Sequence, residues 1–356
     1  MADNFFVTAI LVSHDGQTWL PEAIAAISAQ TRRIDRIIAV DTGSIDNSAK
    51  MLSNAGLTVI KTDRDAGFGD AIALALGSAK RLKSDDQEEL LWILHDDCAP
   101  SRTALQFLIE GLAEKPQVAF VGPKLLGWHD RRHLLEVGIS IAVNGARWTG
   151  LDPREQDQGQ YEQPTDVLSV STAAMLVRRK VFENLGGLDP NLALFRDDVD
   201  LGWRARVAGF SVLTAPQALV YHVEAAASEL RSVDVEEAFL HRPRLLDRKN
   251  AAYVLLVNAS WWLLPWIALQ IVGSAAIRAL GYLIAKLPGY AADEIAAVGL
   301  LIIKPQDLLA ARKLRKSKRL LSPRIIREYI PPRGSQVRLA IEQGNYALRK
   351  YFKSNQ

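Results

Sequence analysis

The N-terminal third of the chain alternates short apolar runs with segments in which apolar residues recur with a helical period. The short runs are typical of buried strands, and the periodic segments are typical of helices that cover a sheet. We expect strands at residues 5–12, 34–40, 57–62, 90–94 and 118–121. We expect helices at residues 19–30, through Met51 and Leu52, from Asp70 to about Lys83, and from Pro100 to about Glu114. This alternation predicts an α/β fold with a doubly wound, mostly parallel sheet.

The pattern becomes less regular after residue 125. Residues 136–163 are polar, contain glycine and show no clear period, which favours a hairpin and loops. Residues 167–177 form another apolar run, which predicts a buried strand. Its hydroxyl residues Ser169, Ser171 and Thr172 are expected to pack in the core. Two short strands are expected at residues 211–214 and 218–220.

Acidic residues follow two of the expected strands. The run at 90–94 ends in His95-Asp96-Asp97, and the run at 34–40 ends in Asp41. Ligands bind at the carboxyl ends of strands in open α/β sheets. Adjacent ionised carboxylates repel each other, so a cation beside them is favoured, and such oxygen ligands suit Mg²⁺ or Mn²⁺ with a phosphate. The alternative is a solvated turn in which an Asp caps a helix.

A second acidic cluster lies near residue 198. If a helix begins at Val199, then Asp197, Asp198 and Asp200 crowd its N-terminus. The helix dipole favours anions there, which is a purely structural explanation. A catalytic role is the alternative.

These motifs together resemble the family 2 glycosyltransferases of GT-A fold, a Rossmann-like architecture. The resemblance is carried by Val40-Asp41-Thr42-Gly43-Ser44-Ile45-Asp46, by Gly67-Phe68-Gly69, by His95-Asp96-Asp97, and by Asp197-Asp198-Val199-Asp200-Leu201-Gly202-Trp203-Arg204. It covers about residues 5 to 320. One departure is that His95 stands where the family motif has its first Asp.

The resemblance implies roles for individual residues. Asp41 would contact the base of a nucleotide-diphosphate sugar, and Ser13, Gly67 and Asp96 would complete the donor nucleotide site. Asp97 and His222 would hold Mn²⁺ or Mg²⁺. Asp198 would be the catalytic base of an inverting transfer. Supporting positions are His95, Asp197 and Trp203.

Composition and charge narrow the class of protein. Apolar residues make up 49% of the chain and charged residues 23%, which is ordinary for a globular protein, whereas a mean hydropathy of +0.02 is slightly high for a wholly soluble one. The single cysteine, Cys98, excludes an internal disulfide and fits a reducing compartment. No secretory signal is expected at the N-terminus. Residues 305–356 carry 13 Lys and Arg against 3 Asp and Glu, whereas the rest of the chain is acidic. An acidic body with a basic tail does not fit a nucleic-acid binder.

A long apolar segment follows the expected catalytic domain. It runs from about 251 to 277, a second apolar stretch covers 295–303, and basic residues cluster at 242–249 and 312–319. The first run is long enough to span a bilayer, but basic residues at both ends favour interfacial or re-entrant helices on the cytoplasmic side. A helical subdomain packed on the catalytic domain is the alternative.

The sequence therefore predicts a catalytic domain at 1–240, a membrane-associated helical segment at 241–320 and a basic tail at 321–356 that leads into further domains of a longer protein. The predicted activity is an inverting, metal-dependent hexosyltransferase of the bacterial cell envelope. It would act on a lipid-linked or polysaccharide acceptor at the cytoplasmic face of the plasma membrane. The alternatives are a nucleotidyltransferase of related fold and a non-catalytic membrane scaffold.

Overall fold

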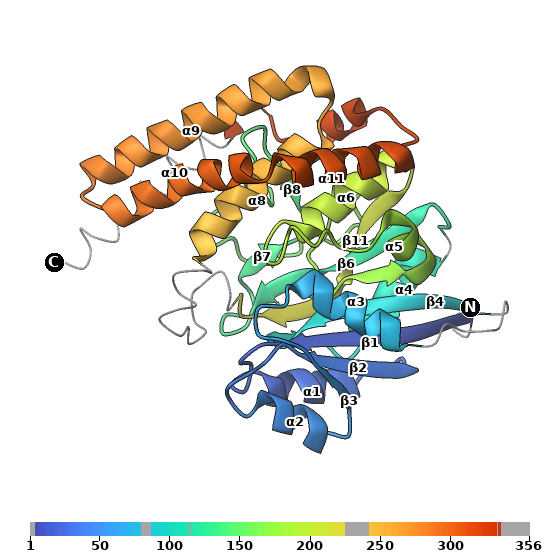
Figure 1. The fold of residues 1–356 in the computed structure, drawn as a ribbon. Helices are drawn as coiled ribbons and strands as arrows, with labels where there is room; N and C mark the ends of the chain where they lie inside the picture. Colours follow the sequence, from blue (N-terminus) through green and yellow to red (C-terminus); the bar gives the residue numbers. More distant parts are fainter. Residues whose placement is uncertain (1–3, 80–86, 114, 225–241, 333, 336–356) are drawn as a thin grey trace.

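The computed structural model describes residues 4–79, 87–113, 115–224, 242–332 and 334–335 (Figure 1). The N-terminal part is a strand and helix alternation, as predicted. Its strands are β1 (Phe5–Ser13), β2 (Arg36–Asp41), β3 (Thr58–Lys61) and β4 (Glu88–His95), and its helices are α1 (Leu20–Ser28), α2 (Ser48–Asn54), α3 (Phe68–Ser78) and α4 (Ala104–Ala113). These four strands pair in parallel in the order β3-β2-β1-β4.

The sheet continues with strands from the middle of the chain. These are β5 (Cys98–Pro100), β6 (Val118–Gly127), β7 (Leu134–Glu136), β10 (Leu176–Arg178) and β11 (Ser211–His222). The order after β4 is β10-β6-β11-β5, with β7 paired to β6. A separate hairpin joins β8 (Ser140–Ile141) to β9 (Arg147–Trp148), which confirms the expected hairpin.

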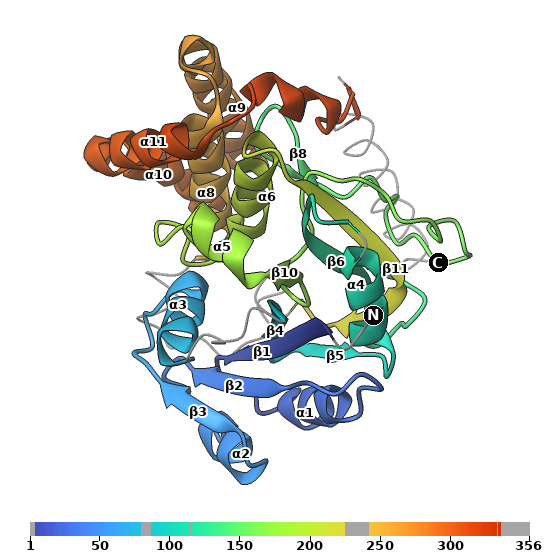
Figure 2. The same ribbon diagram turned by 90° about the vertical axis from the view of Figure 1, so that its right-hand side faces the viewer.

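Alternate residues of the central strands pack on opposite faces of the sheet. In β4, Trp92 belongs to the core cluster under α1, α2 and α4, whereas Ile93 belongs to the cluster under α3, α5 (Arg179–Leu185) and α6 (Asp197–Val207). This period of two is what a strand buried on both faces requires. Two helical layers therefore enclose the sheet (Figure 2).

Three of the expected strands are extended or joined in the structure. The strand predicted at 118–121 continues through Pro123 to Gly127, and the strands predicted at 211–214 and 218–220 form one strand, β11. Both changes have one cause: a register irregularity in β11 between Ala215 and Leu219 lies opposite Pro123. Proline has no N–H for the ladder and is tolerated at such irregularities.

The strand predicted at 167–177 is mostly absent. Only Leu176–Arg178 pairs as a strand, and the preceding residues are buried but irregular. The Ser171 hydroxyl accepts a hydrogen bond from the Ala173 N–H, a local contact that competes with a strand ladder. The predicted ends of two helices, near Lys83 and near Glu114, lie outside the described residues.

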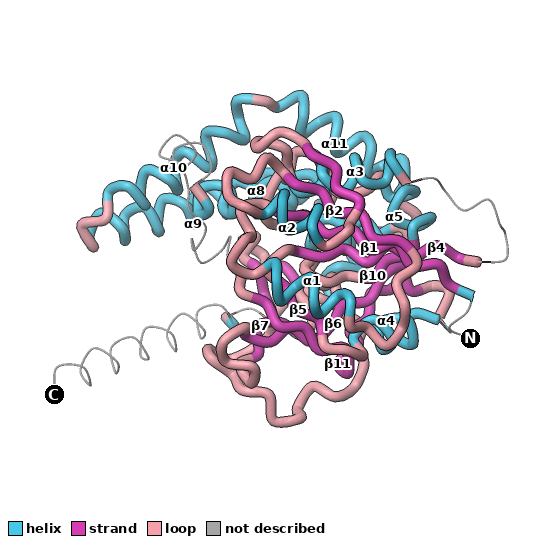
Figure 3. The backbone as a smooth tube through the Cα atoms, turned by 90° about the horizontal axis from the view of Figure 1, so that it is seen from below, coloured by secondary structure: helices cyan, strands magenta, loops and turns pink. Residues whose placement is uncertain are grey.

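The C-terminal part is helical. It contains α8 (Pro243–Asn258), a 3₁₀ turn η2 (Trp261–Leu263), α9 (Leu264–Ile284), α10 (Pro288–Ile303), α11 (Pro305–Lys318) and a 3₁₀ turn η3 (Pro323–Glu328). The long apolar run is thus broken between α8 and α9, with Pro265 in the first turn of the second helix. Helix α8 packs against α6, while α9 and α10 lie together away from β3 and α2 (Figures 1 and 3).

The buried and exposed parts of this helical segment differ. Residues of α8 such as Val254 and Val257 are buried with Trp203 of α6 in one core cluster. By contrast, Trp266, Ile277 and Leu280 of α9 are more than half exposed. Among the described residues, Trp261–Ile284 is the one helical stretch long and apolar enough to cross a membrane.

Candidate active site

The acidic motifs meet at the carboxyl edge of the sheet. Ser13 at the end of β1 pairs in register with Asp41 at the end of β2. His95 ends β4 beside Val12 of β1. Parallel pairing alone therefore brings the tips of three strands together, which is where the sequence predicted the donor site.

Asp96 is held under the turn that follows β1. It is 1% exposed, and its Oδ2 accepts hydrogen bonds from the Ser13 hydroxyl at 3.0 Å and the His14 N–H at 2.9 Å. A Cβ at Gly16 would lie 2.1 Å from the same oxygen, so only glycine fits there. Asp96 thus fixes the path of the Ser13–Gly16 turn.

An ion pair that the sequence analysis missed joins this turn to the β3–α3 loop. Arg64 donates to Asp15 Oδ2 at 2.6 Å, and Asp15 Oδ1 accepts from the Ile45 N–H at 2.8 Å. Burial opposes ionisation of Asp15, but Arg64 and the Ile45 N–H outweigh it and lower the pKa of the carboxyl. No local signal marks such a pair, because its members are far apart in sequence.

The two other predicted donor residues lie on the same side. Asp41 is 2% exposed, and its Oδ1 is buried with no hydrogen-bond partner among the described residues. Gly67 packs so closely that a Cβ would lie 2.8 Å from the Ala193 Cα, and the Phe68 N–H donates to the Ala193 carbonyl at 2.9 Å. A buried, unsatisfied carboxylate oxygen at a strand tip is the feature expected where a ligand donor binds.

Two histidines and an aspartate form a compact cluster. Potential ligand atoms of His95, Asp97 and His222 all lie within 4.8 Å of one another. His222 Nε2 is 3.2 Å from Asp97 Oδ1, and His95 Nδ1 is 4.0 Å from the same oxygen. His222 reaches the cluster because the end of β11 pairs antiparallel with β5, directly after Asp97. The sequence analysis placed Asp97 and His222 together but gave His95 only a supporting place.

The donor set of this cluster fits a divalent cation. One carboxylate and two imidazoles are ligands that Mn²⁺ accepts. Burial would lower the pKa of His222, but Cys98 and Asp97 outweigh burial and raise it well above its ordinary value. A cation that binds the His222 ring must displace the proton that this raised pKa favours. Burial also raises the pKa of the Cys98 thiol.

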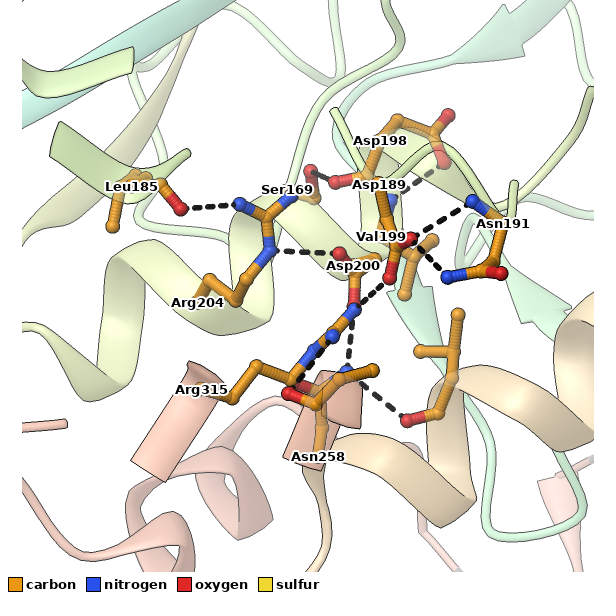
Figure 4. Close-up of polar contacts among 12 residues, drawn as sticks. Ser169, Leu185, Asp189, Asn191, Asp198, Val199, Asp200, Arg204, Asn258 and Arg315 are labelled. Carbon is orange, nitrogen blue, oxygen red and sulfur yellow. Dashed lines mark hydrogen bonds and ion pairs between the residues drawn. The ribbon is translucent and has the colours of Figure 1, made fainter. Parts of the chain in front are cut away.

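Asp198 lies in the first turn of α6 and is held by three contacts, of which Figure 4 draws those with Ser169 and Val199. Its Oδ1 accepts from the Val199 N–H at 2.6 Å, its backbone carbonyl accepts from the Ser169 hydroxyl at 2.6 Å, and its Oδ2 accepts from Arg147 at 2.7 Å. Arg147, in β9, also donates to Glu136 at 2.6 Å. Arg147 and Glu136 were not singled out from the sequence.

Burial favours the neutral form of two carboxyl groups near Arg147, those of Asp197 and Glu136. Burial, with a further contribution from Asp198, raises the pKa of Asp197 to about 7. Burial also raises the pKa of Glu136, and Arg147 offsets this only in part. Burial opposes the charge of Arg147, but Asp198 and Glu136 outweigh it and raise the pKa of the guanidinium.

One short segment connects the cation cluster to Asp198. The Ser169 hydroxyl donates to the Asp198 carbonyl, and the Thr172 hydroxyl lies 3.3 Å from His95 Nε2. Three residues span at most about 11 Å, so this segment brings His95 and the first turn of α6 into the same region of the molecule. Ser169, Ser171 and Thr172 are all buried, as expected from the sequence, and two of them also contact the Asp198 carbonyl and the His95 ring. Trp203 is 5% exposed and packs against α8, so its indole stabilises α6 from the far side.

Comparisons with known proteins agree with this architecture. The family described as Glycosyltransferase like family 2 matches residues 7–234. The chain is 22% identical over 288 residues to N-acetylglucosaminyl-diphospho-decaprenol L-rhamnosyltransferase of Mycobacterium tuberculosis, covering 76% of this chain and 90% of that protein. It is 24% identical over 218 residues to the O-antigen chain rhamnosyltransferase RfbN of Salmonella typhimurium, covering 61% of this chain and 66% of that protein.

A solved structure shares the fold. The crystal structure of GalNAc-T7 with UDP, GalNAc and Mn²⁺ superposes with a TM-score of 0.60 and 17% identity. The match covers 92% of this chain and 57% of that one. At this identity the likeness concerns the fold alone.

Proposed function

The chain belongs to glycosyltransferase family 2 and has the GT-A fold, and on that premise we propose that it is an inverting, metal-dependent transferase that uses a nucleoside-diphosphate sugar. The family match favours this activity over the nucleotidyltransferase and the scaffold. The observation that carries the proposal is the pair of contacts made by the 169–172 segment, from Ser169 to the Asp198 carbonyl and from Thr172 to His95. These contacts support the proposal that the candidate cation cluster and Asp198 act on the same donor.

The donor would bind along the tips of β1, β2 and β4. Asp41 offers a buried carboxylate oxygen to the base. Ser13 is itself buried and would act by holding, with Asp96, the turn beside the nucleotide. Gly67 allows the neighbouring backbone to come close. The Asp15–Arg64 ion pair fixes the loops on either side, which lowers the entropy lost on binding.

The diphosphate of the donor would lie at the cation cluster. His95, Asp97 and His222 would hold Mn²⁺ or Mg²⁺, which supplies positive charge to the leaving nucleoside diphosphate. Their rigid attachment to β4, β5 and β11 fixes where that charge is placed.

Asp198 is proposed to act as general base. It takes the proton of an acceptor hydroxyl as that oxygen attacks the anomeric carbon, and the bond from this carbon to the diphosphate oxygen breaks. Attack from the side opposite the leaving group inverts the anomeric configuration. Arg147 and the Val199 N–H orient the carboxylate, and Arg147 moves away from Oδ2, or shares it, when the acceptor hydroxyl binds.

The names of two relatives suggest the class of acceptor. One name contains a sugar diphospho-decaprenol, which is a polyprenyl lipid, and the other contains an O-antigen chain. We therefore propose a lipid-linked or polysaccharide acceptor in synthesis of the cell envelope. A polyprenyl carrier lies in a membrane, so the active site would work at the cytoplasmic face of the plasma membrane.

The exposed face of α9 supports membrane association. Its apolar side chains recur along one side of the helix, and the opposite side, with Ile267 and Ile271, is buried. Because one side of α9 packs on the rest of the protein, we propose that its exposed apolar side lies in the membrane interface and that the helix does not cross the bilayer. Lys313 and Lys316 of α11 are exposed and can meet anionic headgroups, whereas Arg242 and Arg248 are paired with Asp293 and Glu294.

Calorimetric titration tests the donor site. UDP, GDP and TDP sugars are titrated into the full chain with and without Mn²⁺. The proposal predicts that one nucleotide binds and that binding requires the ion. Silence across the panel from a folded protein would contradict the donor site proposed here.

A further inference from the structure

A buried ion-pair network joins the C-terminal helices to the helix that carries Asp198 (Figure 4). At its centre is Arg315 of α11, which is 5% exposed. Its Nη2 donates to Asp200 Oδ1 at 2.8 Å and also to Asp189 Oδ2. Asn258, at the end of α8, donates to the same Asp200 oxygen at 2.7 Å.

Asp189 and Asp200 lie near the two ends of one irregular segment, residues 189–196, called here the 189–196 loop. Asp189 begins this loop, and Asp200 lies in the first turn of α6, directly after it. The guanidinium of Arg315 thus bonds one carboxylate at the start of the loop and another just after its end. Asp198 lies between the loop and Asp200, so the position of its carboxylate depends on both.

The loop ends in an unfavourable backbone conformation. Phe195 and Arg196 both have left-handed dihedrals, with φ of 64° and 69°. Non-glycine residues in this region cost on the order of 1 kcal/mol or more each, so surrounding contacts must hold them. Asn250 of α8 donates to the Leu194 carbonyl at 2.6 Å, and Arg196 pairs with Asp247 of the same helix at 2.7 Å.

The loop also reaches the donor side of the site. The Ala193 carbonyl accepts from the Phe68 N–H, and Gly67 packs directly on Ala193. A displacement of the 189–196 loop would therefore move both the backbone at Gly67, in the proposed donor site, and the first turn of α6, which carries Asp198.

Packing between α11 and the start of the loop is incomplete. A cavity of about 360 Å³ opens between them, lined in part by Leu188, Pro190 and Leu314. The ion pairs of Arg315 thus carry much of the contact there. Arginine suits this place because Nη2 bonds both carboxylates while Nε donates to Asn258 Oδ1 at 3.2 Å and Nη1 donates to the Ala311 carbonyl at 3.3 Å, a spread of donors that a lysine ammonium does not offer.

We infer that Arg315 is a positioning residue: from α11 it fixes the 189–196 loop and, through it, the carboxylate of Asp198. This inference rests on the proposed role of Asp198. It makes the C-terminal helices part of the catalytic machinery, since the apolar helices α9 and α10 lie in the chain between α8 and α11. A force on those helices at a membrane would be transmitted to the loop by Arg315.

Arg315→Gln tests this inference, and Arg312→Gln is its matched control. Both arginines lie on α11 and donate to α8 or its C-terminal cap, but among the described residues Arg312 bonds only the carbonyls of Leu256 and Ala259. Hydrogen exchange of the full chain is measured without ligand on peptides covering residues 189–200. We expect exchange there to be at least tenfold faster in Arg315→Gln and unchanged in Arg312→Gln. Equal protection in the two variants would overturn the inference.

A milder variant covers the case in which Arg315→Gln does not fold. Tyr253 donates to Asp189 Oδ2 at 2.9 Å, so Tyr253→Phe loosens the same carboxylate and keeps the packing of the ring. It should accelerate exchange of the same peptides several-fold. No change in Tyr253→Phe, with no folded Arg315→Gln, would also overturn the inference.

A kinetic measurement separates positioning from stability. With the nucleotide sugar that binds in the calorimetric panel, release of nucleoside diphosphate should fall at least tenfold in kcat in Arg315→Gln. The donor Kd should rise by a smaller factor, since the loop also contacts Gly67. Arg315→Lys should recover part of kcat. Faster exchange with unchanged kcat would overturn the link to Asp198. Failure of the wild-type chain to turn over any donor would count against the proposed function, while the exchange measurement would still decide whether Arg315 holds the loop.

Discussion

At the scale of single residues, Arg147 is the group that connects two buried carboxylates beside α6. It bonds both Asp198 and Glu136, and these carboxylates are nearly inaccessible to water. Removing one member of a buried ion pair leaves an uncompensated charge, which is costly because the partner cannot return to water. Arg147 is therefore expected to matter for stability as well as for catalysis.

Arg147→Met should lower the free energy of unfolding by about 3 kcal/mol, the cost of breaking a buried pair. It should also lower kcat, because Asp198 loses the group that orients it. Arg131→Met is the control, since the Arg131–Glu22 pair is about half exposed on both sides and such pairs contribute about 1 kcal/mol or less. Urea denaturation of both variants checks this, and equal losses would contradict the role of Arg147.

Asp197 gives a pH prediction. Its pKa is about 7 in the fold against 3.8 for the free group, so between these values the folded state binds a proton that the unfolded state has lost. Stability must therefore fall as pH rises through this window, and the loss is complete above about pH 7. Asp197→Asn removes the titration, so the difference in unfolding free energy between the Asp197→Asn variant and wild type should grow from pH 4 to pH 7. A difference that stays constant across this range would contradict the raised pKa.

The residues that sequence reasoning identified and those that it missed differ in one physical respect. Asp41, Asp97 and Asp198 stand at ends of elements whose periodicity is local, so their place at the sheet edge follows from the pattern. Arg147 and Arg315 reach their partners across the fold, 51 residues and more than 100 residues away. Such contacts leave no local pattern, and only the tertiary structure shows them.

At the scale of elements, the central strands were predictable because β1 and β4 are buried on both faces. The 167–177 segment was not, because its pairing at Ser169 is an isolated bridge to Ile139 and the Ser171 hydroxyl accepts a local hydrogen bond from the Ala173 N–H. The long apolar run of residues 251–277 forms parts of two helices that differ in burial, and hydropathy alone does not distinguish them. Helix α8 is buried against α6, whereas α9 keeps an exposed apolar face.

This division changes how membrane binding should be tested. A truncation near Arg248 would remove most of α8, including buried residues such as Val254 and Val257, and would unfold the core around Trp203. Single substitutions on the exposed face of α9 avoid that problem.

Ile277→Asp and Leu280→Asp should each lower binding to vesicles containing anionic lipid by about tenfold, because a charge replaces an apolar contact with the bilayer interface. Both side chains are more than half exposed, so the fold should be kept. Leu74→Asp, on α3, is the control for a charge added at an exposed leucine elsewhere. Vesicle sedimentation measures the bound fraction. Unchanged binding in both α9 variants would contradict an interfacial role for this helix.

At the scale of the whole molecule, the acidic body and the basic C-terminal region are complementary. Arginines of the two basic clusters turn inward to buried acids, as Arg242 does to Asp293 and Arg315 to Asp189. Part of the positive charge that the sequence suggested for a membrane surface is therefore used within the fold. The exposed lysines of α11 remain for that surface.

The whole fold holds together the proposed donor site, the candidate cation cluster and the first turn of α6. The sheet fixes His95 and Asp97, β11 returns His222 to them, and the C-terminal helices hold the loop before Asp198. Donor binding and transfer should then depend on different carboxylates, although both lie in the same region of the molecule.

The central claim is tested most directly by comparing Asp97→Asn with Asp198→Asn. Donor binding is measured by calorimetry with Mn²⁺, and transfer is measured as release of nucleoside diphosphate. Asp97→Asn should abolish Mn²⁺-dependent binding, whereas Asp198→Asn should keep the donor Kd within about twofold and lower kcat by a factor on the order of 10² to 10⁴. Equal loss of donor binding in the two variants would contradict the assignment of Asp97 to the cation and Asp198 to the acceptor proton.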